Sequence, residues 1–544
     1  MTETVRHADP SAPAVRWGTE TVEEAYLGHP GRQYRDRPRS VLQMLDTVPQ
    51  WAERAFIVQG ERRIRYGTFL AAVDEGAAIL ERNGVVPGSR VLLFAYNSPE
   101  FVLAVWAIWR AGGVPVMGNR WWSQAEIDNA MALTHPVVAL TDFAGLEAGA
   151  ARRVMLSELS PAFDAAPGVP GHRSERHEGG EDDVALVIFT SGSTGVPKAV
   201  SLSQRSVIAN QHNLLLRSRQ LPQDLDPEAP QTVSLVCTPL FHVGGVSNLI
   251  TQPIIGGRLV LNEGKFDPVQ VLQIIEREGV HRWGGVPTMA GRVLEHPDLE
   301  KYDLSSLRSF PLGGAPLSPQ LLDRLRSKLP QLERRGLANT WGMTESGGFI
   351  TVAGNRDLAQ RPGTVGSPYP IAELRIDNPD EHGVGEILVR CPTVMTGYVG
   401  LEDDATVDGD GWLHTGDLGH LDEDGFLYLD GRSKDIVIRG GENIACRHVE
   451  QALLEHPDVY DVAVVGVPHA DLGEEVAAVV VLRAGAEPTS EMLRDFVKPR
   501  LAYFEVPSRW FLQRDELPTL PGEKVDKRTI RAELEARLGG GSAR

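Results

Sequence analysis

FTSGSTGVPK, residues 189–198, follows directly on the apolar run VALVI at residues 184–188. An apolar run of this length predicts a buried strand, and the loop after it carries glycines, hydroxyl side chains and a lysine. Glycine has no Cβ, so the backbone can bend sharply and bring its N–H groups close to an anion. The alternative is an ordinary Ser/Gly surface turn, since short motifs also occur by chance. The candidate phosphate-binding residues are Thr190, Ser191, Gly192, Ser193, Thr194, Gly195 and Lys198.

This loop is not the Walker pattern. That pattern ends in Gly-Lys-Ser/Thr, whereas here Pro197 precedes the lysine and Ala199 follows it. The sequence therefore disfavours P-loop kinases and GTPases.

Composition limits the classes of protein that fit. With 544 residues the chain is too long for one hydrophobic core, so we expect at least two domains. The chain has 54 basic and 73 acidic residues, a net charge of −19, which disfavours nonspecific binding to nucleic acid or to an anionic membrane. The cysteines, Cys237, Cys391 and Cys446, lack metal-ligand spacing and are expected to be reduced thiols.

The sequence also bears on localisation. The first residues, MTETVRHADPSAPAVRW, have neither the apolar core nor the cleavage site of a signal peptide. The most apolar stretch, residues 101–109, is about half as long as a membrane-spanning helix needs to be. We therefore expect a cytoplasmic protein without a membrane span.

The order of helical and strand patterns predicts an α/β fold. Between residues 41 and 141 the two patterns alternate, which indicates parallel sheets covered by helices. After Gly363 the pattern becomes strand-rich with tight turns, which suggests a small β-barrel subdomain. A smaller α/β domain follows from Ser433. The predicted divisions are a loosely ordered arm (1–35), a large domain (36–432), a small domain (433–538) and a flexible tail (539–544).

Further motifs follow the first loop in a fixed order. They are LGGAP at 312–316, TWGMTE at 340–345, LHTGD at 413–417, GRSKD at 431–435, GGEN at 440–443 and GEKVDK at 522–527. Taken together, they resemble the motifs of the adenylate-forming superfamily, which includes acyl-CoA synthetases, aryl-CoA ligases, luciferases and carrier-protein adenylation domains. The resemblance extends from about Leu42 to Leu534, and it implies a large AMP-binding domain followed by a small mobile domain.

The resemblance implies an ATP site. It assigns Gly313, Gly314 and Ala315 to the adenine-contacting turn, and Trp341 and Gly342 to the aromatic motif, where the family more often has tyrosine. Asp417 would accept hydrogen bonds from the ribose hydroxyls, and Arg432 would reach the ribose or the phosphates. Taken alone, Trp341 fits a core aromatic better, and Asp417 fits a Gly-Asp turn.

The resemblance also implies catalytic residues. Attack of a carboxylate on the α-phosphate of ATP brings two anions together, so the site needs cations and donors. Glu345 is the candidate Mg²⁺ ligand, and Thr344 can donate to the α-phosphate. Lys524 is the candidate adenylation catalyst, although Glu523 stands where the family usually has glycine. Lys434 matches the family's pivot, and Lys527 and Arg528 are expected to face solvent.

The remaining motifs concern the thiol and the acid. Gly440 and Gly441 would allow the pantetheine chain of coenzyme A to approach the backbone, although Ala445–Cys446 replaces the usual aromatic-Pro pair. The candidate acid-pocket residues are His242, Val246, Val286, Gly313 and Met343. His242 is alternatively a structural histidine. No aspartate lies between Phe241 and Val246 to pair with an amino group, so we expect a plain, bulky, apolar acid, either ring-bearing or of medium to long chain.

The implied reaction is ATP- and Mg²⁺-dependent ligation of a small-molecule carboxylic acid to coenzyme A, by a monomer or a homodimer. An alternative is a stand-alone adenylation enzyme that loads the phosphopantetheine thiol of a carrier protein, although the last hundred residues contain no Asp-Ser-Leu attachment site. A luciferase-type oxidoreductase and a non-catalytic nucleotide sensor are two further alternatives. Lys524 and Glu345 disfavour the sensor, which would be expected to lose one of them.

Overall fold

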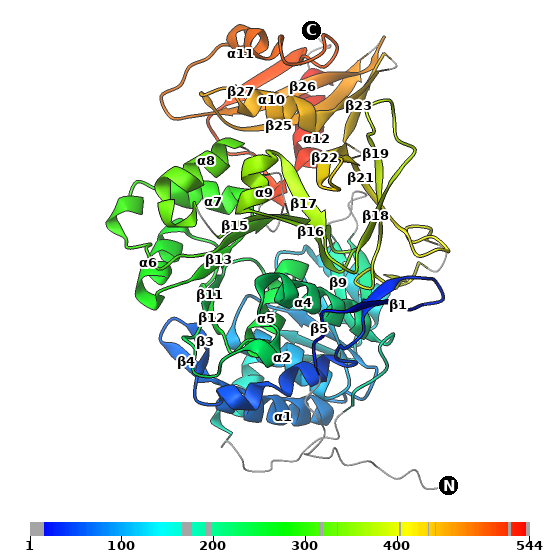
Figure 1. Ribbon diagram of the computed structural model, residues 1–544, viewed down its shortest axis with the longest axis vertical. Coiled ribbons are helices and arrows are strands. Elements are labelled where there is room, and N and C mark those ends of the chain that lie inside the picture. Colours follow the sequence, from blue (N-terminus) through cyan, green and yellow to red (C-terminus); the bar gives the residue numbers. More distant parts are fainter. Residues whose placement is uncertain are drawn as a thin grey trace.

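The computed structural model describes residues 16–165, 177–190, 197–314, 317, 319–333, 336–401, 404–432, 435–440, 442–469, 471–520 and 524–539. A large body holds the N-terminal four-fifths of the chain, and a small body lies at one end of it (Figure 1). Within the described residues, no helix is both long and apolar enough to cross a membrane.

The first sheet has seven strands in the order β20-β10-β9-β6-β5-β7-β8. Strands β5 to β9 pair in parallel, and β10 is antiparallel to β9 and β20. One face packs on α1 and α2, and the other on α3. The elements are β5 (Arg90–Phe94), β6 (Val114–Gly118), β7 (Val138–Thr141), β8 (Arg152–Met155), β9 (Val184–Thr190), β10 (Lys198–Ser203), β20 (Gly397–Tyr398), α1 (Tyr66–Arg82), α2 (Pro99–Arg110), α3 (Gln124–Thr134) and η3 (Leu156–Asp164).

The second sheet has the order β13-β11-β12-β3-β4, with parallel pairs from β13 to β3. Helix α5 covers one face, and α6 and α7 cover the other. The elements are β3 (Ala55–Gln59), β4 (Arg62–Arg65), β11 (Val233–Val236), β12 (Arg258–Leu261), β13 (Arg282–Gly284), α4 (Gln204–Ser218), α5 (Val243–Ile254), α6 (Pro268–Glu278), α7 (Pro287–Leu294), η4 (Pro222–Asp224) and η5 (Leu299–Lys301). These two sheets confirm the predicted parallel, helix-covered architecture.

The third sheet has eight strands in the order β14-β15-β16-β17-β22-β21-β19-β18. The strand-rich segment predicted after Gly363 supplies β17 to β19, β21 and β22, which continue the sheet that β14 to β16 begin. The elements are β14 (Phe310–Gly313), β15 (Leu337–Met343), β16 (Gly348–Gly354), β17 (Thr364–Pro368), β18 (Glu373–Asp377), β19 (Gly385–Arg390), β21 (Leu413–Leu421), β22 (Leu427–Arg432), α8 (Pro319–Lys328), η6 (Pro330–Leu332) and α9 (Asn355–Gln360).

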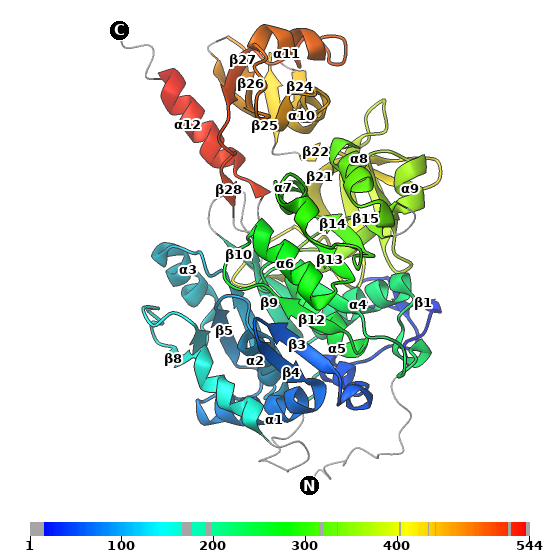
Figure 2. The same cartoon turned by 90° about the vertical axis from the view of Figure 1, so that its left-hand side faces the viewer.

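The small body is built on β25 and β26, whose successive side chains point to opposite faces of the sheet. Val462 and Val464 pack with α10 and α11, whereas Ala463 and Val465 pack with α12. The elements are β23 (Ile436–Arg439), β24 (Glu442–Ala445), β25 (Val459–His469), β26 (Gly473–Leu482), β27 (Arg509–Gln513), β28 (Thr519–Leu520), β29 (Lys524–Val525), α10 (Cys446–Leu454), α11 (Ser490–Val497) and α12 (Lys527–Gly539). Figure 2 shows β28 at the end of the small body nearest the large one.

The N-terminal segment corrects one expectation. We predicted a loosely ordered arm as far as residue 35, but residues 16–35 lie against α4 in the structure. Trp17 and Tyr34 are both buried, and their rings contact His212 on two sides, at centroid distances of 5.1 and 3.9 Å. Aromatic burial of this kind outweighs the polar composition of the segment. Its elements are β1 (Thr21–Glu23), β2 (Arg32–Tyr34), η1 (Val41–Leu45) and η2 (Val48–Trp51).

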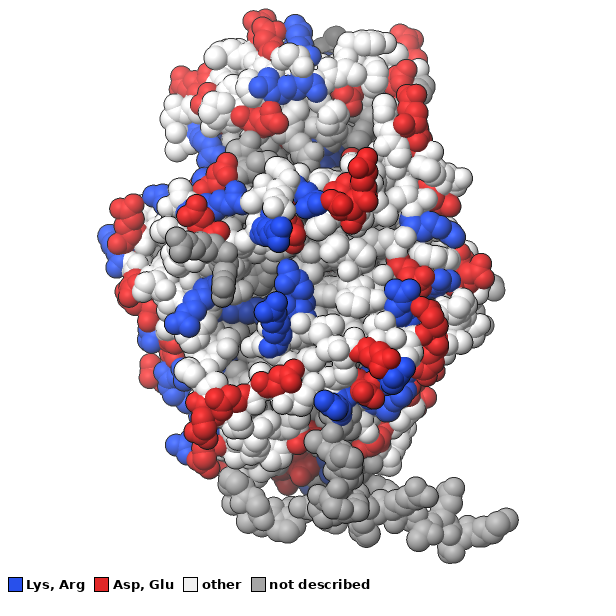
Figure 3. All heavy atoms as spheres, viewed as in Figure 1, with Lys and Arg blue, Asp and Glu red and all other residues white. Residues whose placement is uncertain are grey.

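Charged side chains of both signs alternate over the face shown in Figure 3, where one group of basic side chains gathers near the middle. The acidic excess of the chain is therefore not gathered on this face, which offers a polyanion only a local basic patch.

Candidate active site

The candidate residues meet where parallel strands end. Val236 of β11 pairs with Gly284 of β13, Gly285 bridges to Leu312, and Gly313 of β14 pairs with Thr340 of β15. The segments after these strands therefore open on one edge of the sheets, and ligands of open α/β sheets bind outside such carboxyl ends. The predicted residues His242, Val286, Gly313, Gly314, Trp341, Gly342, Met343, Thr344 and Glu345 lie in these strands or in the segments that follow them.

The turn after β14 needs glycine because it lies close to the neighbouring strand. A Cβ on Gly313 would lie 2.4 Å from Oγ1 of Thr340, whose hydroxyl donates to the carbonyl of Leu312 at 3.1 Å. Gly314 follows with a φ of +76°, in the left-handed region that favours glycine. The predicted adenine-contacting turn is therefore tight, and the part of it that the structure describes needs glycine at both positions.

Asp417 is the most firmly held carboxylate at this edge. It is 5% exposed, and each of its oxygens accepts a hydrogen bond. Trp341 Nε1 donates to Oδ2 at 2.8 Å, and Arg432 Nε donates to Oδ1 at 2.7 Å. The Asp417 carboxylate raises the pKa of Arg432, with smaller contributions from Asp435 and Glu345. Each oxygen keeps a second lone pair for another donor, such as a ribose hydroxyl.

Trp341 is both a core aromatic and a hydrogen-bond partner of Asp417. Its side chain is buried in the main hydrophobic core, as expected of a core aromatic, and its indole N–H orients Asp417. Its contact with adenine stays a prediction.

Glu345 is held through both its backbone and its side chain. Met395 N donates to the Glu345 carbonyl at 2.9 Å, and the Tyr398 hydroxyl donates to Oε1 at 2.9 Å. Lys198 Nζ lies 4.3 Å from the centre of the Tyr398 ring and 3.4 Å from Oδ2 of Asp404. Tyr398 and Asp404 were not among the predicted site residues, because neither stands in a phosphate-, adenine- or ribose-binding motif.

The two ends of the phosphate loop lie side by side, because Thr190 of β9 pairs with Lys198 of β10. The loop residues Ser191, Gly192, Ser193, Thr194 and Gly195 lie outside the described residues, as do Ala315, Lys434 and Gly441. The backbone of Lys524 is described and pairs with Leu520 in the β28–β29 hairpin. Gly440 lies in the turn after β23, where its N–H donates to the Leu472 carbonyl at 2.8 Å.

Lys527 differs from its prediction. We expected it to face solvent, but its Nζ lies 2.7 Å from Oε1 of Glu450 and 3.8 Å from Oδ2 of Asp435. Lys527 therefore joins the start of α12 to α10 and to the beginning of the small body. Cys446 is a free, buried cysteine, and burial raises the pKa of its thiol to about 12.

The start of α5 contains two glycines in different surroundings. A Cβ on Gly245 would lie 2.2 Å from the Pro239 carbonyl oxygen, whereas a Cβ on Gly244 would have no atom within 4 Å. One turn later, Asn248 is half-buried, and its Nδ2 donates to the Gly244 carbonyl at 2.9 Å. Val246, a predicted pocket residue, is 3% exposed and belongs to the main core. Gly244 therefore borders open space, and the sequence had not pointed to its hydrogen-bond partner Asn248.

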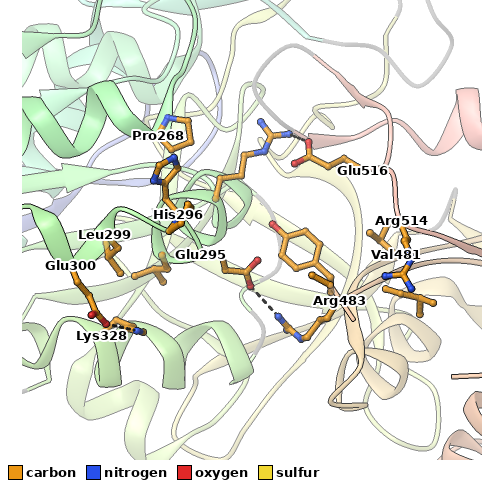
Figure 4. Close-up of a pocket in the computed structure, with 16 residues that line it drawn as sticks. Pro268, Glu295, His296, Leu299, Glu300, Lys328, Val481, Arg483, Arg514 and Glu516 are labelled. Atoms are coloured by element: carbon orange, nitrogen blue, oxygen red, sulfur yellow. Dashed lines mark hydrogen bonds and ion pairs between the residues drawn. The ribbon is translucent and has the colours of Figure 1, made fainter. Parts of the chain in front are cut away.

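A separate cleft of about 930 Å³ lies between the two bodies, at the C-terminal end of α7 (Figure 4). Arg292 of α7 forms an ion pair with Glu516 of the small body, and Glu295 pairs with Arg483 at 3.0 Å. These pairs join the large body to the small one in the orientation of Figure 1.

Comparisons with known proteins agree with this geometry. Residues 45–399 match the model of the AMP-binding enzyme family, and residues 448–524 match the model of the AMP-binding enzyme C-terminal domain. The chain belongs to the AMP-binding enzyme family. A feruloyl-CoA synthase from Amycolatopsis is 35% identical over 87% of this chain and 94% of its own length. A long-chain-fatty-acid–CoA ligase from Bacillus subtilis is 29% identical over 92% of this chain and 95% of its own length.

A solved structure shares the whole architecture. O-succinylbenzoate coenzyme A synthetase from Bacillus subtilis, in complex with ATP and magnesium ion, is 28% identical with a TM-score of 0.76, and the match covers 92% of this chain and 99% of that one. The protein is thus an AMP-forming acid–CoA ligase of the acyl/aryl-CoA synthetase type, which uses ATP, Mg²⁺ and coenzyme A.

The residues present suit a magnesium ion that arrives with the nucleotide. Among the described residues, no group of three or more His, Cys, Asp or Glu side chains could hold a metal by itself. Magnesium bound with ATP needs only one or two carboxylates, because phosphate oxygens and waters supply its other ligands. Glu345 can supply such a carboxylate, with Oε1 bound to Tyr398.

Proposed function

We propose that the protein activates a ring-bearing carboxylic acid as its acyl adenylate, with release of pyrophosphate, and then transfers the acyl group to coenzyme A. The observation that carries this proposal is the arrangement of two fixed carboxylates at one sheet edge. Asp417 is held by Trp341 and Arg432, and Glu345 is held by Tyr398. This arrangement suits a nucleotide whose ribose and phosphates are bound at separate points.

In the first step, the chain's own residues would bind and orient the reactants. Asp417 would accept the ribose hydroxyls, the Gly313–Gly314 turn would face the adenine, and the loop between Thr190 and Lys198 would surround the phosphates. Magnesium held by Glu345 would neutralise charge on the phosphate oxygens. Thr344 and Lys524 would donate to the charge that develops on the α-phosphate.

In the second step, the small domain would rotate relative to the large domain and present a different face to the active site. Gly440 and Gly441 would then flank the thiol chain, and Lys524 would leave the site. We place the boundary between the domains at residues 432–433 and the pivot at Lys434, and such rotations are carried by a few residues with large φ/ψ changes.

The preference for a ring-bearing acid is supported by the open space beside Gly244. No neighbouring atom would exclude a side chain at residue 244. The helix nevertheless has glycine there, which costs about 0.5–1 kcal/mol relative to alanine. The feruloyl and O-succinylbenzoate relatives are named for ring-bearing acids, and the fatty-acid relative shows that long chains also occur in the family.

A panel of carboxylic acids tests this proposal. Each acid is incubated with ATP and Mg²⁺, with and without coenzyme A, and the products are measured by mass spectrometry. We expect AMP, pyrophosphate and the thioester, with the highest kcat/KM for a ring-bearing acid. Formation of ADP would contradict the reaction. An adenylate that forms but is not transferred to coenzyme A would favour a carrier-protein thiol as the acceptor.

A further inference from the structure

Tyr398 lies where three segments of the candidate site meet. Its short strand, β20, pairs with β10 directly after the phosphate loop, with Val200 opposite Tyr398 and Ser201 opposite Gly397. Three residues earlier, Met395 N donates to the Glu345 carbonyl. The backbone around Tyr398 is therefore joined both to the strand that begins at Lys198 and to the candidate metal ligand.

The Tyr398 hydroxyl makes a directed contact with the Glu345 side chain. It donates to Oε1 at 2.9 Å. A carboxylate with one oxygen fixed in this way has lost most of its rotational freedom, and Oε2 is left for another ligand.

The Tyr398 ring makes a second contact on its face. Lys198 Nζ lies 4.3 Å from the ring centre, a distance at which an ammonium is attracted to the π-electrons. The same Nζ lies 3.4 Å from Asp404. The tyrosine thus contacts both Glu345 and the lysine that closes the phosphate loop, although these two charged residues come from segments about 150 residues apart.

We propose that Tyr398 is a positioning residue for the adenylation step: its hydroxyl aims the Glu345 carboxylate at the metal of Mg·ATP, and its ring holds Lys198 beside the phosphate loop. This inference rests on the proposed role of Glu345. A purely structural tyrosine would contribute packing alone, which phenylalanine supplies almost equally well. The positioning role and the structural role therefore predict different results for Tyr398→Phe, which removes only the hydroxyl oxygen.

The test measures ATP binding by calorimetry in the absence of the acid, over a range of Mg²⁺ concentrations, so that turnover plays no part. Tyr398→Phe is expected to raise the Mg²⁺ concentration needed for half-maximal binding by about 10- to 100-fold, as is usual when the partner of a metal ligand is removed. Its Tm should stay at the wild-type value. Tyr503→Phe is the matched control, because Tyr503 is 87% exposed, and it should behave as wild type.

A double-mutant cycle with Glu345→Gln separates the inference from the proposed function. If Glu345 binds the metal, Glu345→Gln raises the Mg²⁺ requirement by itself, and Tyr398→Phe adds nothing in that background. An effect of Tyr398→Phe that persists in the Glu345→Gln background would overturn the inference. The inference would also be overturned if Glu345→Gln raised the Mg²⁺ requirement while Tyr398→Phe left it unchanged. If Glu345→Gln has no effect, the metal role of Glu345 fails and the inference fails with it.

Tyr398→Leu tests the contact with Lys198. It removes the ring as well as the hydroxyl, so it should reproduce the Mg²⁺ defect and also weaken binding of metal-free ATP, which Tyr398→Phe leaves unchanged. Equal binding of metal-free ATP by the two variants would refute the role of the ring.

Discussion

The indole Nε1 of Trp341 donates a hydrogen bond to Oδ2 of Asp417 at 2.8 Å, across 76 residues of sequence. Trp341 ends up in this position because β15 carries it into the core, and Asp417 lies on β21 of the same sheet. The contact joins the aromatic motif to the predicted ribose-binding motif.

We expect Trp341→Phe to weaken ATP binding by about 10- to 100-fold, because the lost hydrogen bond to a charged group is worth about 1.5–3 kcal/mol. The ring is kept, so any adenine stacking should survive. Calorimetric ATP titration checks this. Trp510→Phe is the control, since it removes an indole hydrogen bond to the Pro507 carbonyl in the small domain and should leave ATP affinity unchanged.

Lys524→Ala should nearly abolish adenylation while thioester formation from pre-made acyl adenylate stays largely intact. The lysine would act on charge that exists only in the first step, and losing such a contact commonly costs about 10²- to 10³-fold in rate. Single-turnover rates of each half-reaction decide the matter, with Lys498→Ala as a surface control. Equal losses in both steps would show that Lys524 is structural.

The Arg292–Glu516 pair joins the two domains, so reversing one charge should favour other orientations of the small domain. We expect Arg292→Glu or Glu516→Arg to slow adenylation by up to about fivefold, because partly exposed ion pairs are worth only about 0–1 kcal/mol. The double reversal should restore the rate. Lys498→Glu breaks a pair within the small domain and should have no effect. Failure of the double variant to recover would show that the pair does not control orientation.

Gly244 and Gly245 should respond differently to substitution. Gly244→Leu fills open space, so the protein should keep its Tm while kcat/KM falls for ring-bearing acids relative to short acids. Gly245→Ala should lower the Tm instead, because its Cβ would overlap the Pro239 carbonyl. The prediction is wrong if Gly244→Leu leaves the ranking of acids unchanged.

Asp461 should make stability depend on pH. Burial, reinforced by Glu450 and Glu516, raises the pKa of Asp461 to about 6. The folded state therefore binds a proton more tightly than the unfolded state does, and stability from this group is lost as pH rises from about 4 to about 6. Asp461→Asn should raise the Tm at pH 7.5 relative to wild type and have little effect at pH 4. Thermal unfolding at the two pH values checks this, and an equal shift at both would rule out titration as the cause.

Much of the architecture could be predicted because it depends on local patterns. Alternating periodicities indicated the helix-covered parallel sheets, and the strands that became β5, β7 and β9 are short apolar runs whose burial the structure confirms. The order of the motifs indicated the family, since each motif is a contiguous segment. The burial of residues 16–35 was missed because it depends on His212, which is nearly 180 residues from Tyr34 and still further from Trp17 in the sequence.

By itself, the sequence determined the fold class, the family and the chemistry of the candidate residues, because these follow from residue type and spacing within single segments. Only the tertiary structure decided which side chains work together. It paired Trp341 with Asp417, placed Tyr398 between Glu345 and Lys198, and left Gly244 beside open space while Gly245 lies against backbone. The physical reason is that a hydrogen bond or a close contact depends on distances of a few ångströms between strands that are far apart in the chain. Those distances are set by sheet register, which no single segment specifies.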